Sequence, residues 1–420
     1  MIRKLLKIKL AFWVKCFIWR FQPKIVAITG SVGKTSTKEA IAKVLENKFQ
    51  IRKSKGNYNN EIGVPLAILG EESAGKNLFL WSFIFLKSFV KLFSKSYPEI
   101  LILELGTDRA GDINYLVNLL GKIDVAVITD IGISHLEFFG SPAELAREKL
   151  SLIKKLQPAN AAVLNFDNIK IFEGKNQTKA QVIGYGFSNE AQLRASDFHL
   201  IQTQGVWGAN FKVHFEGNVV PFFLPQVLGR PGVYAALAAA SVGLRFNINL
   251  VHASEALKQY ESPPGRMKLL AGIKHTQIID DTYNAAPSSA IAALDALKEI
   301  AQGRKVVVMG SMAELGAKND AGHREVAEKI MEVRADLVFL VGIDAKIIQN
   351  ELDKRKYWGR VIWFNTSDEA RLPIQNAILE GDMILVKGSQ AVRMEKIVKE
   401  IMADPMNAEK LLVRQGPNWD

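Results

Sequence analysis

A glycine-rich turn between an apolar run and a helical pattern constrains the fold of this chain more than any other feature. The turn lies in the sequence TGSVGKTST at residues 29–37, directly after an apolar run. A turn in this context is typical of a phosphate-binding loop at the start of a helix. Gly30 and Gly33 would let backbone amides approach an anion. Lys34 would reach the β- and γ-phosphates of a nucleotide, and Thr35 would offer its hydroxyl to Mg²⁺.

Short apolar runs alternate with helical patterns through the first half of the chain. This rhythm predicts a doubly wound, mostly parallel sheet. A helix is expected from Lys34 to about Glu46, and strands are expected at 24–29, Ile100–Leu103, Val125–Thr129, Ala161–Leu164 and Gln181–Tyr185. From Phe198 to Leu224 the pattern changes to alternation, with turns at Gly205, Gly208 and Gly217. That change predicts a small antiparallel meander on the same unit.

A second α/β unit is expected after the sequence SPPG at 262–265, which is typical of a linker. Its strands are predicted near Gln277–Asp280, Lys305–Met309, Asp336–Leu340, Val361–Phe364 and Met383–Val386. We therefore expect a basic arm at 1–23, a P-loop-type central domain at 24–265 and a Rossmann-like C-terminal domain at 266–420.

The net charge of +11 is confined to two segments. Residues 1–24 carry seven basic side chains and residues 76–97 carry four, and neither segment has an acid. Together they account for the whole excess, so the charges of the remaining residues balance. This distribution argues against a general basic coat for nucleic acid.

Both basic segments are also rich in aromatic residues. The first holds Trp13, Phe17, Trp19 and Phe21, and the second holds Phe79, Trp81, Phe83, Phe85, Phe89 and Phe93. Basic residues beside Trp and Phe are typical of helices that lie in the plane of an anionic bilayer. Neither segment has the roughly 20 uncharged apolar residues needed to span a membrane. Three interpretations remain open: contact with a membrane surface, packing on the protein itself or a second subunit, and an export signal.

Four further features lie downstream of the phosphate loop in the same unit. Glu104 ends a predicted strand, where a carboxylate could complete a Mg²⁺ shell begun by Thr35. His135 follows the next predicted strand, and Lys149 lies on the helix after that. The sequence GNYNN at 56–60 offers three amides that could bind phosphate or a carboxylate. Each feature alone is more typical of a structural role than of a site.

Taken together, nine stretches of sequence make the chain resemble the Mur ligases. They are TGSVGKTS at 29–36, GNYNNEIGVP at 56–65, LELG at 103–106, HLEFFGS at 135–141, REKLSLI at 147–153, PGRM at 264–267, DDTYNAAPSS at 280–289, MAELG at 312–316 and VKGS at 386–389. These stretches keep the family order over about residues 24–400. DDTYNA and MAELG resemble motifs of one branch of the family, whose members join D-alanyl-D-alanine to the UDP-N-acetylmuramoyl-tripeptide.

The resemblance implies roles for single residues. The implied catalytic set is Lys34, Asn60, His135 and Lys149. The implied nucleotide contacts are Gly30, Ser31, Gly33, Lys34, Thr35, Ser36, Arg266, Asp281, Tyr283 and Asn284. Two Mg²⁺ ions are implied, the first held by Thr35 and Glu104 and the second by His135 and Lys149. Lys149 matches a lysine that the family carbamylates, and Asn59 lies beside Asn60 near the phosphates. Lys387 and Ser389 match positions where the C-terminal domain meets the substrate.

Three departures from the family pattern are visible. Only about 23 residues precede the first strand, where the branch carries a domain that grips the uridine diphosphate. Gly232 and Ala235 stand where the family has two asparagines near the adenine. Gln390 stands where the branch usually has an arginine. The first departure leaves recognition of the uridine diphosphate without its family domain. The second implies that contacts to the nucleotide base are made differently, and the third weakens the predicted clamp on the incoming substrate.

These features predict a cytoplasmic, ATP-dependent amide ligase that works through an acyl phosphate in peptidoglycan precursor synthesis. The substrates implied by the resemblance are the UDP-muramoyl-tripeptide and D-alanyl-D-alanine, with possible peripheral contact at the inner membrane face. The single cysteine, Cys16, agrees with a reducing compartment. Two alternatives remain: a Mur-type ligase acting on a folate or poly-amino-acid carboxylate, and an ATP-binding scaffold without turnover.

Overall fold

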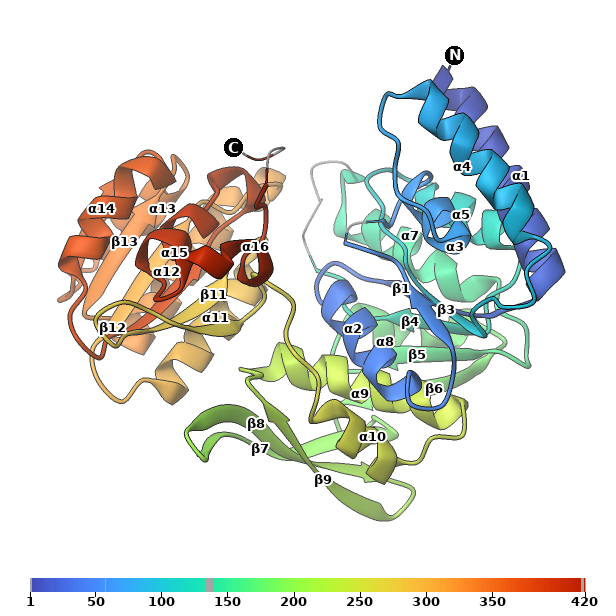
Figure 1. Ribbon diagram of the computed structural model, residues 1–420. Helices are drawn as coiled ribbons and strands as arrows, with labels where there is room; N and C mark the ends of the chain where they lie inside the picture. Colours follow the sequence, from blue (N-terminus) through green and yellow to red (C-terminus); the bar gives the residue numbers. More distant parts are fainter. Residues whose placement is uncertain (1, 57, 133–138, 417–418, 420) are drawn as a thin grey trace.

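The computed structural model describes the chain except for residues 1, 57, 133–138, 417–418 and 420. Within that part, two α/β units follow one another, each built around one sheet (Figure 1). The first sheet has nine strands, in the spatial order β2 (Ile51–Lys53), β3 (Ile100–Glu104), β1 (Lys24–Thr29), β4 (Val125–Ile128), β5 (Ala161–Asn165), β6 (Gln181–Gly186), β7 (Leu193–Thr203), β8 (Val206–Phe215) and β9 (Asn218–Pro225). The second has six, in the order β10 (Lys268–Ala271), β11 (Gln277–Asp281), β15 (Met383–Lys387), β12 (Lys305–Gly310), β13 (Leu337–Val341) and β14 (Arg360–Phe364). The predicted α/β class is confirmed.

Strand β1 lies inside the first sheet because its apolar residues can be buried on both faces. The four residues from Ile25 to Ile28 have no solvent exposure. β1 pairs in parallel with β3 and β4, and Ile28 lies opposite Glu104 and Val127. Parallel strands end at the same edge of a sheet, so Thr29 and Glu104 lie at one edge.

The meander is the antiparallel end of the first sheet. β7 pairs with β8 and β8 with β9, both antiparallel. Gly208, predicted as a turn, instead lies inside β8, where a β-carbon would come within 2.6 Å of the Leu224 carbonyl oxygen. Two further strands are absent from the sequence prediction. β2 has only three residues, two of them basic, and β10 is a short edge strand paired antiparallel with β11.

Helices cover both faces of each sheet. On the first sheet, α2 (Lys34–Leu45), α9 (Arg230–Arg245) and α10 (Leu250–Leu257) cover one face, and α3 (Gly63–Leu69), α5 (Asp112–Leu120), α7 (Pro142–Lys154) and α8 (Ile169–Gly174) cover the other. On the second sheet, α11 (Pro287–Ile300), α12 (Asn319–Val333) and α13 (Ala345–Lys354) lie opposite α14 (Ser367–Ala377), α15 (Glu395–Ile401) and α16 (Ala408–Leu411). The short 3₁₀ turns are η1 (Lys175–Gln177), η2 (Gly316–Lys318), η3 (Gln390–Val392) and η4 (Pro405–Asn407).

The two basic aromatic segments form α1 (Ile2–Phe21) and α4 (Leu78–Lys91) at the outer edge of the first unit (Figure 1). Helix α1 packs on α3 and α5, and its Leu10, Val14 and Phe17 are fully buried. The rings of Trp13 and Phe89 join the two helices, with centroids 6.5 Å apart. One face of each helix therefore packs on the protein. In the described part of the chain, no helix is long and apolar enough to cross a membrane.

Candidate functional site

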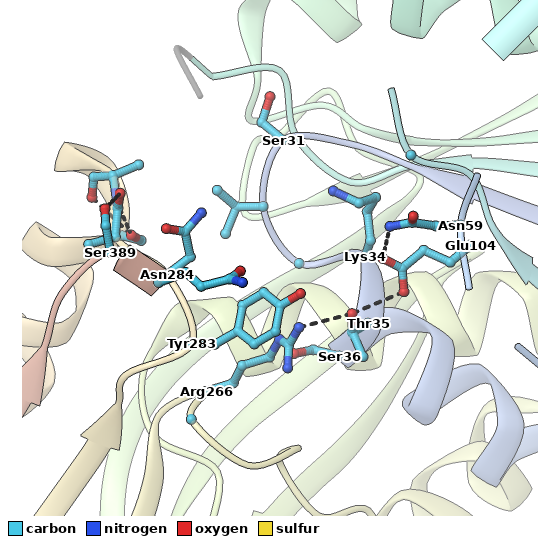
Figure 2. A pocket seen from close by; sticks show the side chains of 18 of the residues that line it. Ser31, Lys34, Thr35, Ser36, Asn59, Glu104, Arg266, Tyr283, Asn284 and Ser389 are labelled. Carbon is cyan, nitrogen blue, oxygen red and sulfur yellow. Dashed lines mark hydrogen bonds between the residues drawn. The ribbon is translucent and has the colours of Figure 1, made fainter. Parts of the chain in front are cut away.

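A cavity of about 620 Å³ lies between the two units. The first unit contributes the phosphate loop, the end of β3 and Lys149. The linker contributes Gly265 and Arg266, and the second unit contributes loops that follow β11, β12 and β15. Figure 2 shows Lys34, Asn59 and Glu104 of the first unit on one side of the cavity and Asn284 and Ser389 of the second unit on the other. The cavity thus brings together segments far apart in the sequence.

The phosphate loop has the backbone geometry that an anion site requires. Gly33, at φ 88°, is the residue before α2, so the free amides of the first helical turn point toward the cavity. Gly30 packs so closely on β4 that a β-carbon would lie 2.0 Å from the Thr129 hydroxyl oxygen. The Ser31 amide donates to the Asp130 carbonyl at 2.8 Å, which fixes the middle of the loop.

The side chains predicted for phosphate and metal meet at the start of α2. The Thr35 hydroxyl donates to Glu104 Oε2 at 3.0 Å, and the Asn59 amide donates to Glu104 Oε1 at 3.5 Å. Lys34 Nζ donates to the Gly30 carbonyl oxygen at 2.7 Å. Burial lowers the pKa of Lys34, and the charge of Arg266 lowers it further. These contacts assemble a cation, a hydroxyl and a carboxylate on one wall (Figure 2).

Lys38 also belongs to this group, although it is absent from the sequence prediction. It is 1% exposed, and its Nζ lies 3.7 Å from carboxylate oxygens of both Glu39 and Glu104. Its position one turn after Lys34 on the same helix face is the signal that could have found it. Burial lowers the pKa of Lys38, and Glu104 opposes that effect.

The tandem asparagines of the 56–60 loop do different things. Asn59 contacts Glu104, as described above. The Asn60 side chain accepts the backbone amides of Ile62 and Gly63, at 3.1 and 2.9 Å, and so fixes the start of α3, although Asn60 also lines the cavity. Of the two amides, Asn59 is the one brought to the predicted metal carboxylate.

Lys149 is buried in the wall of the cavity, on α7. It is 2% exposed, and burial followed by the charge of Lys34 lowers its pKa to about 7. Asp130, absent from the sequence prediction, acts on the Lys149 charge in the opposite direction. Asp130 accepts a hydrogen bond from Asn168 at 2.7 Å, and burial raises its pKa. His135, the predicted partner of Lys149, lies outside the described residues.

Arg266 connects the linker to the phosphate loop. Its guanidinium donates to the Thr35 hydroxyl at 3.1 Å and lies 3.6 Å from the centre of the Tyr283 ring. The hydroxyl of Thr35 is therefore held between Glu104 and Arg266 (Figure 2). Tyr283 and Asn284, the predicted nucleotide contacts of the second unit, line the same cavity.

Two residues predicted to meet substrate are engaged inside the second unit. Lys387 is 1% exposed and donates to Asp281 at 2.6 Å and to the Asn284 carbonyl at 3.0 Å. The Ser389 hydroxyl accepts the Ala313 amide at 2.7 Å. These bonds hold together the loops that follow three strands of the second sheet. Asp281 is thus the counter-ion of Lys387 in this arrangement.

The two positions that lack the family asparagines differ in access. Gly232 lines the cavity, whereas Ala235 is 1% exposed in the core. A β-carbon at Gly232 would come within 2.0 Å of a Val227 methyl carbon. A larger side chain at position 232 would therefore require Val227 to move.

The donor set at the start of α2 fits magnesium and phosphate. Carboxylate and hydroxyl oxygens are hard ligands that Mg²⁺ prefers, and it usually keeps waters or phosphates for its remaining positions. No group of three His, Cys, Asp or Glu side chains that could cage a metal occurs among the described residues. The arrangement can therefore bind a polyphosphate and its metal, with a second compound approaching from the second unit.

Two family models match the chain. The model for the Mur ligase middle domain matches residues 28–81 and 82–243, and the model for the Mur ligase glutamate ligase domain matches residues 265–390. The two matched regions fall on the first and second units, respectively.

The chain is also similar to named proteins over most of its length. It is 29% identical over 394 residues to the UDP-N-acetylmuramoyl-tripeptide--D-alanyl-D-alanine ligase of Bacillus subtilis (strain 168), covering 94% of this chain and 79% of that one. The crystal structure of MurF from Acinetobacter baumannii superposes with a TM-score of 0.78 at 26% identity, covering 94% and 79%. MurF ligase from Thermotoga maritima in complex with ADP gives a TM-score of 0.77 at 25% identity, covering 94% and 83%.

Proposed function

The chain belongs to the Mur ligase family, and on that premise we propose that it is an ATP-dependent ligase joining D-alanyl-D-alanine to UDP-N-acetylmuramoyl-tripeptide in peptidoglycan precursor synthesis. Relatives named for this ligase match 94% of the chain. One observation carries the proposal. The Thr35 hydroxyl lies between the Glu104 carboxylate and the Arg266 guanidinium, in a cavity that both units line.

The proposed reaction proceeds in two steps. A carboxylate is a poor acylating agent, so one of its oxygens first attacks the terminal phosphorus of ATP, and ADP leaves. The amine of the dipeptide then attacks the carbonyl carbon of this acyl phosphate. The amine loses a proton, and inorganic phosphate leaves with the former carboxylate oxygen. The products are an amide, ADP and phosphate.

Charged groups of the first unit and of the linker would serve the first step. Lys34 and Arg266 would stabilise negative charge that develops on the transferring phosphoryl group. The loop amides at the start of α2 would hold the other phosphates. The acyl phosphate hydrolyses readily, so closure of the second unit would exclude water. We propose that residues 24–265 and 266–420 are the two bodies that close, with a pivot near residues 264–280.

The metal sites are part of the same proposal. Thr35 and Glu104 would hold one Mg²⁺, and a carbamylated Lys149 would hold a second with His135. Bound there, the ions would offset negative charge on the phosphoryl group. Lys149 is buried next to a cation, which favours its neutral amine, the form that reacts with carbon dioxide. Labelled bicarbonate followed by carbon NMR would detect the carbamate, and a spectrum of Lys149→Arg identical to that of the wild type would contradict it.

The test of the ligase is product formation with defined substrates. Purified protein should release phosphate and form the amide only when ATP, the UDP-muramoyl-tripeptide and D-alanyl-D-alanine are all present. A folate or poly-γ-glutamyl acceptor should give no product. Turnover with such an acceptor instead would reject the proposed substrate, and ATP binding without turnover on any acceptor would indicate a scaffold.

We further propose a cytoplasmic protein that contacts the inner membrane face through α1 and α4. The faces of these helices that do not pack on the protein carry large exposed apolar side chains. They are Leu5, Ile8, Phe12, Trp19, Leu78, Phe79, Leu80, Phe83, Leu86, Phe89, Val90 and, just after α4, Phe93. Leu80, Phe83, Leu86 and Phe89 recur every three residues along α4, and Leu5, Ile8 and Phe12 of α1 are three and four residues apart, so each helix carries an apolar stripe. Large exposed apolar patches on soluble proteins often mark sites of contact with a protein partner or a membrane.

The charge around these stripes favours an anionic bilayer as the partner. Five of the eleven cations in the two segments are paired: Arg3 and Lys7 with Glu61, Lys24 with Asp124, and Lys87 and Lys91 with Glu71. The other six, Lys4, Lys9, Lys15, Arg20, Lys76 and Lys95, are exposed and have no carboxylate partner among the described residues. Each basic residue near an anionic surface contributes roughly 1 kcal/mol of binding free energy.

Vesicle flotation tests this location. The wild type should float with vesicles of mixed neutral and anionic lipid, float less with neutral vesicles, and detach in high salt. Phe79→Ser combined with Phe83→Ser should reduce flotation, because these rings are 81% and 59% exposed. Ile343→Ser combined with Trp358→Ser, which changes exposed apolar residues of the second unit, is the matched control. Equal flotation of the two double variants, or loss of a dimer in light scattering rather than loss of flotation, would reject membrane contact.

A further inference from the structure

Arg393 lies on the wall of the cavity that the second unit forms, together with Gln390, Ala391 and Trp419. It follows the 3₁₀ turn η3 after β15. Its side chain is 25% exposed, its Nε donates to Glu395 at 2.5 Å, and its guanidinium lies 5.3 Å from the centre of the Trp419 ring. Within the described part of the chain, its two terminal nitrogens make no hydrogen bond. Those nitrogens are therefore available to a ligand in the cavity.

Glu395 holds the Arg393 side chain in place but does not cancel its positive charge, because the same carboxylate also pairs with Arg414. Glu395 is completely buried, and its second oxygen accepts a hydrogen bond from Arg414 at 2.8 Å. Arg414 is 5% exposed at its side chain and also donates to the carbonyl oxygens of Thr282 and Tyr283. One carboxylate thus faces two guanidinium groups. Because Arg414 is buried among its partners, the excess positive charge reaches the cavity through Arg393.

The other described cations near this wall already bind protein groups, so Arg393 is the one that a substrate can reach. Lys387 is buried and bonded to Asp281 at 2.6 Å. Arg266, from the linker, is directed to Thr35. Glu314, another acid on the same wall, has an interaction of its own. An anionic group entering from the second unit would therefore meet the Arg393 guanidinium.

We infer that Arg393 binds the carboxylate of the incoming dipeptide, an inference that rests on the proposed function. The dipeptide must bring its amine to the acyl phosphate near Lys34, so its carboxylate extends away from the first unit. A guanidinium matches the two oxygens of a carboxylate with parallel N–H donors. Gln390, where the family resemblance places an arginine, lines the same wall but has no charge. Arg393 supplies the cation there.

The experiment compares D-alanyl-D-alanine with its C-terminal amide, which keeps the amine and lacks the carboxylate. In the wild type the amide should have a higher KM than the dipeptide. Arg393→Ala should raise the KM of the dipeptide about 10- to 100-fold, the loss expected for one hydrogen-bonded ion pair. The KM of the amide, and those of ATP and the UDP-muramoyl-tripeptide, should stay unchanged. Glu395 keeps Arg414 as a partner, so the variant should fold.

Two further variants separate recognition from structure. Arg393→Lys should restore part of the preference for the carboxylate. Adding Gln390→Arg to Arg393→Ala should restore it as well, since position 390 lines the same wall. Equal loss of the dipeptide and the amide in Arg393→Ala would overturn the inference, because it would indicate a structural role. A raised KM for ATP or the UDP-substrate instead would also overturn it, by assigning Arg393 to a phosphate.

The outcomes also distinguish this inference from the proposed function. A wild type that uses the dipeptide and the amide equally well overturns the role of Arg393 and leaves the ligase intact. A wild type that uses neither overturns the ligase, and the inference falls with it.

Discussion

Asp280 is a buried carboxyl group of the second unit, and its ionisation should make the stability of that unit depend on pH. It lies near the end of β11 with no solvent exposure. Its carboxylate accepts hydrogen bonds from the Thr282 hydroxyl at 2.6 Å, the Thr282 amide at 3.2 Å and the Gly265 amide at 3.1 Å. Burial outweighs these bonds and raises the pKa of Asp280 from 3.8 to about 6. We therefore predict that the wild type loses stability relative to Asp280→Asn as the pH rises.

The sign follows from the order of the two pKa values. The folded pKa lies above the unfolded one, so the folded chain retains a proton that the unfolded chain has already released. This stabilising contribution is complete below the unfolded pKa and is lost as the pH rises through the folded pKa. The interval from 3.8 to about 6, at about 1.4 kcal/mol per pH unit, corresponds to about 3 kcal/mol. Between about pH 4.5 and about pH 7.5 the loss should be about 2 kcal/mol.

Native-state hydrogen exchange measures this free energy for the second unit alone. Amides of β11, β12 and β15 should exchange through cooperative opening of their sheet, so their protection reports its stability. Subtracting the unfolding free energy of the wild type from that of Asp280→Asn at each pH removes the contribution of distant titrating groups. At any one pH, the difference in unfolding free energy between the two proteins also includes hydrogen bonds of Asp280 that asparagine cannot make. The informative quantity is therefore how this difference changes with pH. The reasoning would be refuted if this free-energy difference did not vary with pH, or if the wild type became more stable relative to the variant as the pH rises.

Three further outcomes follow from single contacts. Lys387→Met should destabilise the second unit by about 3–5 kcal/mol in urea unfolding, because it leaves Asp281 buried without its counter-ion; a smaller loss in Lys387→Met combined with Asp281→Leu is the control. Gly30→Ala should weaken nucleotide binding in calorimetry, because its methyl group would clash with the Thr129 hydroxyl, and unchanged affinity would contradict that packing. Lys34→Met should slow ADP formation about 100- to 1,000-fold at saturating ATP, with unfolding checked separately, and a rate near that of the wild type would remove Lys34 from the reaction.

Local pattern was enough to predict the elements that bring the first wall together. The apolar run at 24–29, the glycine turn and the helix after it gave β1, the loop and α2 with nearly their observed bounds. The strand ending in Glu104 was predicted in the same way. The sequence placed Thr35 and Glu104 at the same edge of the sheet, and the pairing of β1 with β3 in the structure makes them neighbours. β2 was missed because its three residues carry no periodicity and are ordered by pairing with β3.

The sequence pattern could not predict which side chains from distant segments contact one another. The tandem asparagines are chemically equal in the sequence, and only the fold puts Asn59 on Glu104 and Asn60 on the start of α3. Lys387 lines the cavity, but nothing in the sequence indicated that its ammonium pairs with Asp281, 106 residues earlier in the chain. The Glu395 contacts with Arg393 and Arg414 depend on the C-terminal segment returning to α15, which no local signal announces.

The net charge counted for the segments of α1 and α4 does not show which of their cations are paired in the folded protein. The sequence put an excess of eleven cations in two segments with no acids, but acids outside those segments fold back onto five of them. Glu61, on the rim of the active-site cavity, binds Arg3 and Lys7 of α1. Glu71 likewise holds α4 through Lys87 and Lys91. Four of the paired cations therefore fasten α1 and α4 to the protein, and the fifth, Lys24, pairs with Asp124 from β1. In the proposed membrane contact, attraction to an anionic surface would therefore use cations other than those that pair with Glu61, Glu71 and Asp124.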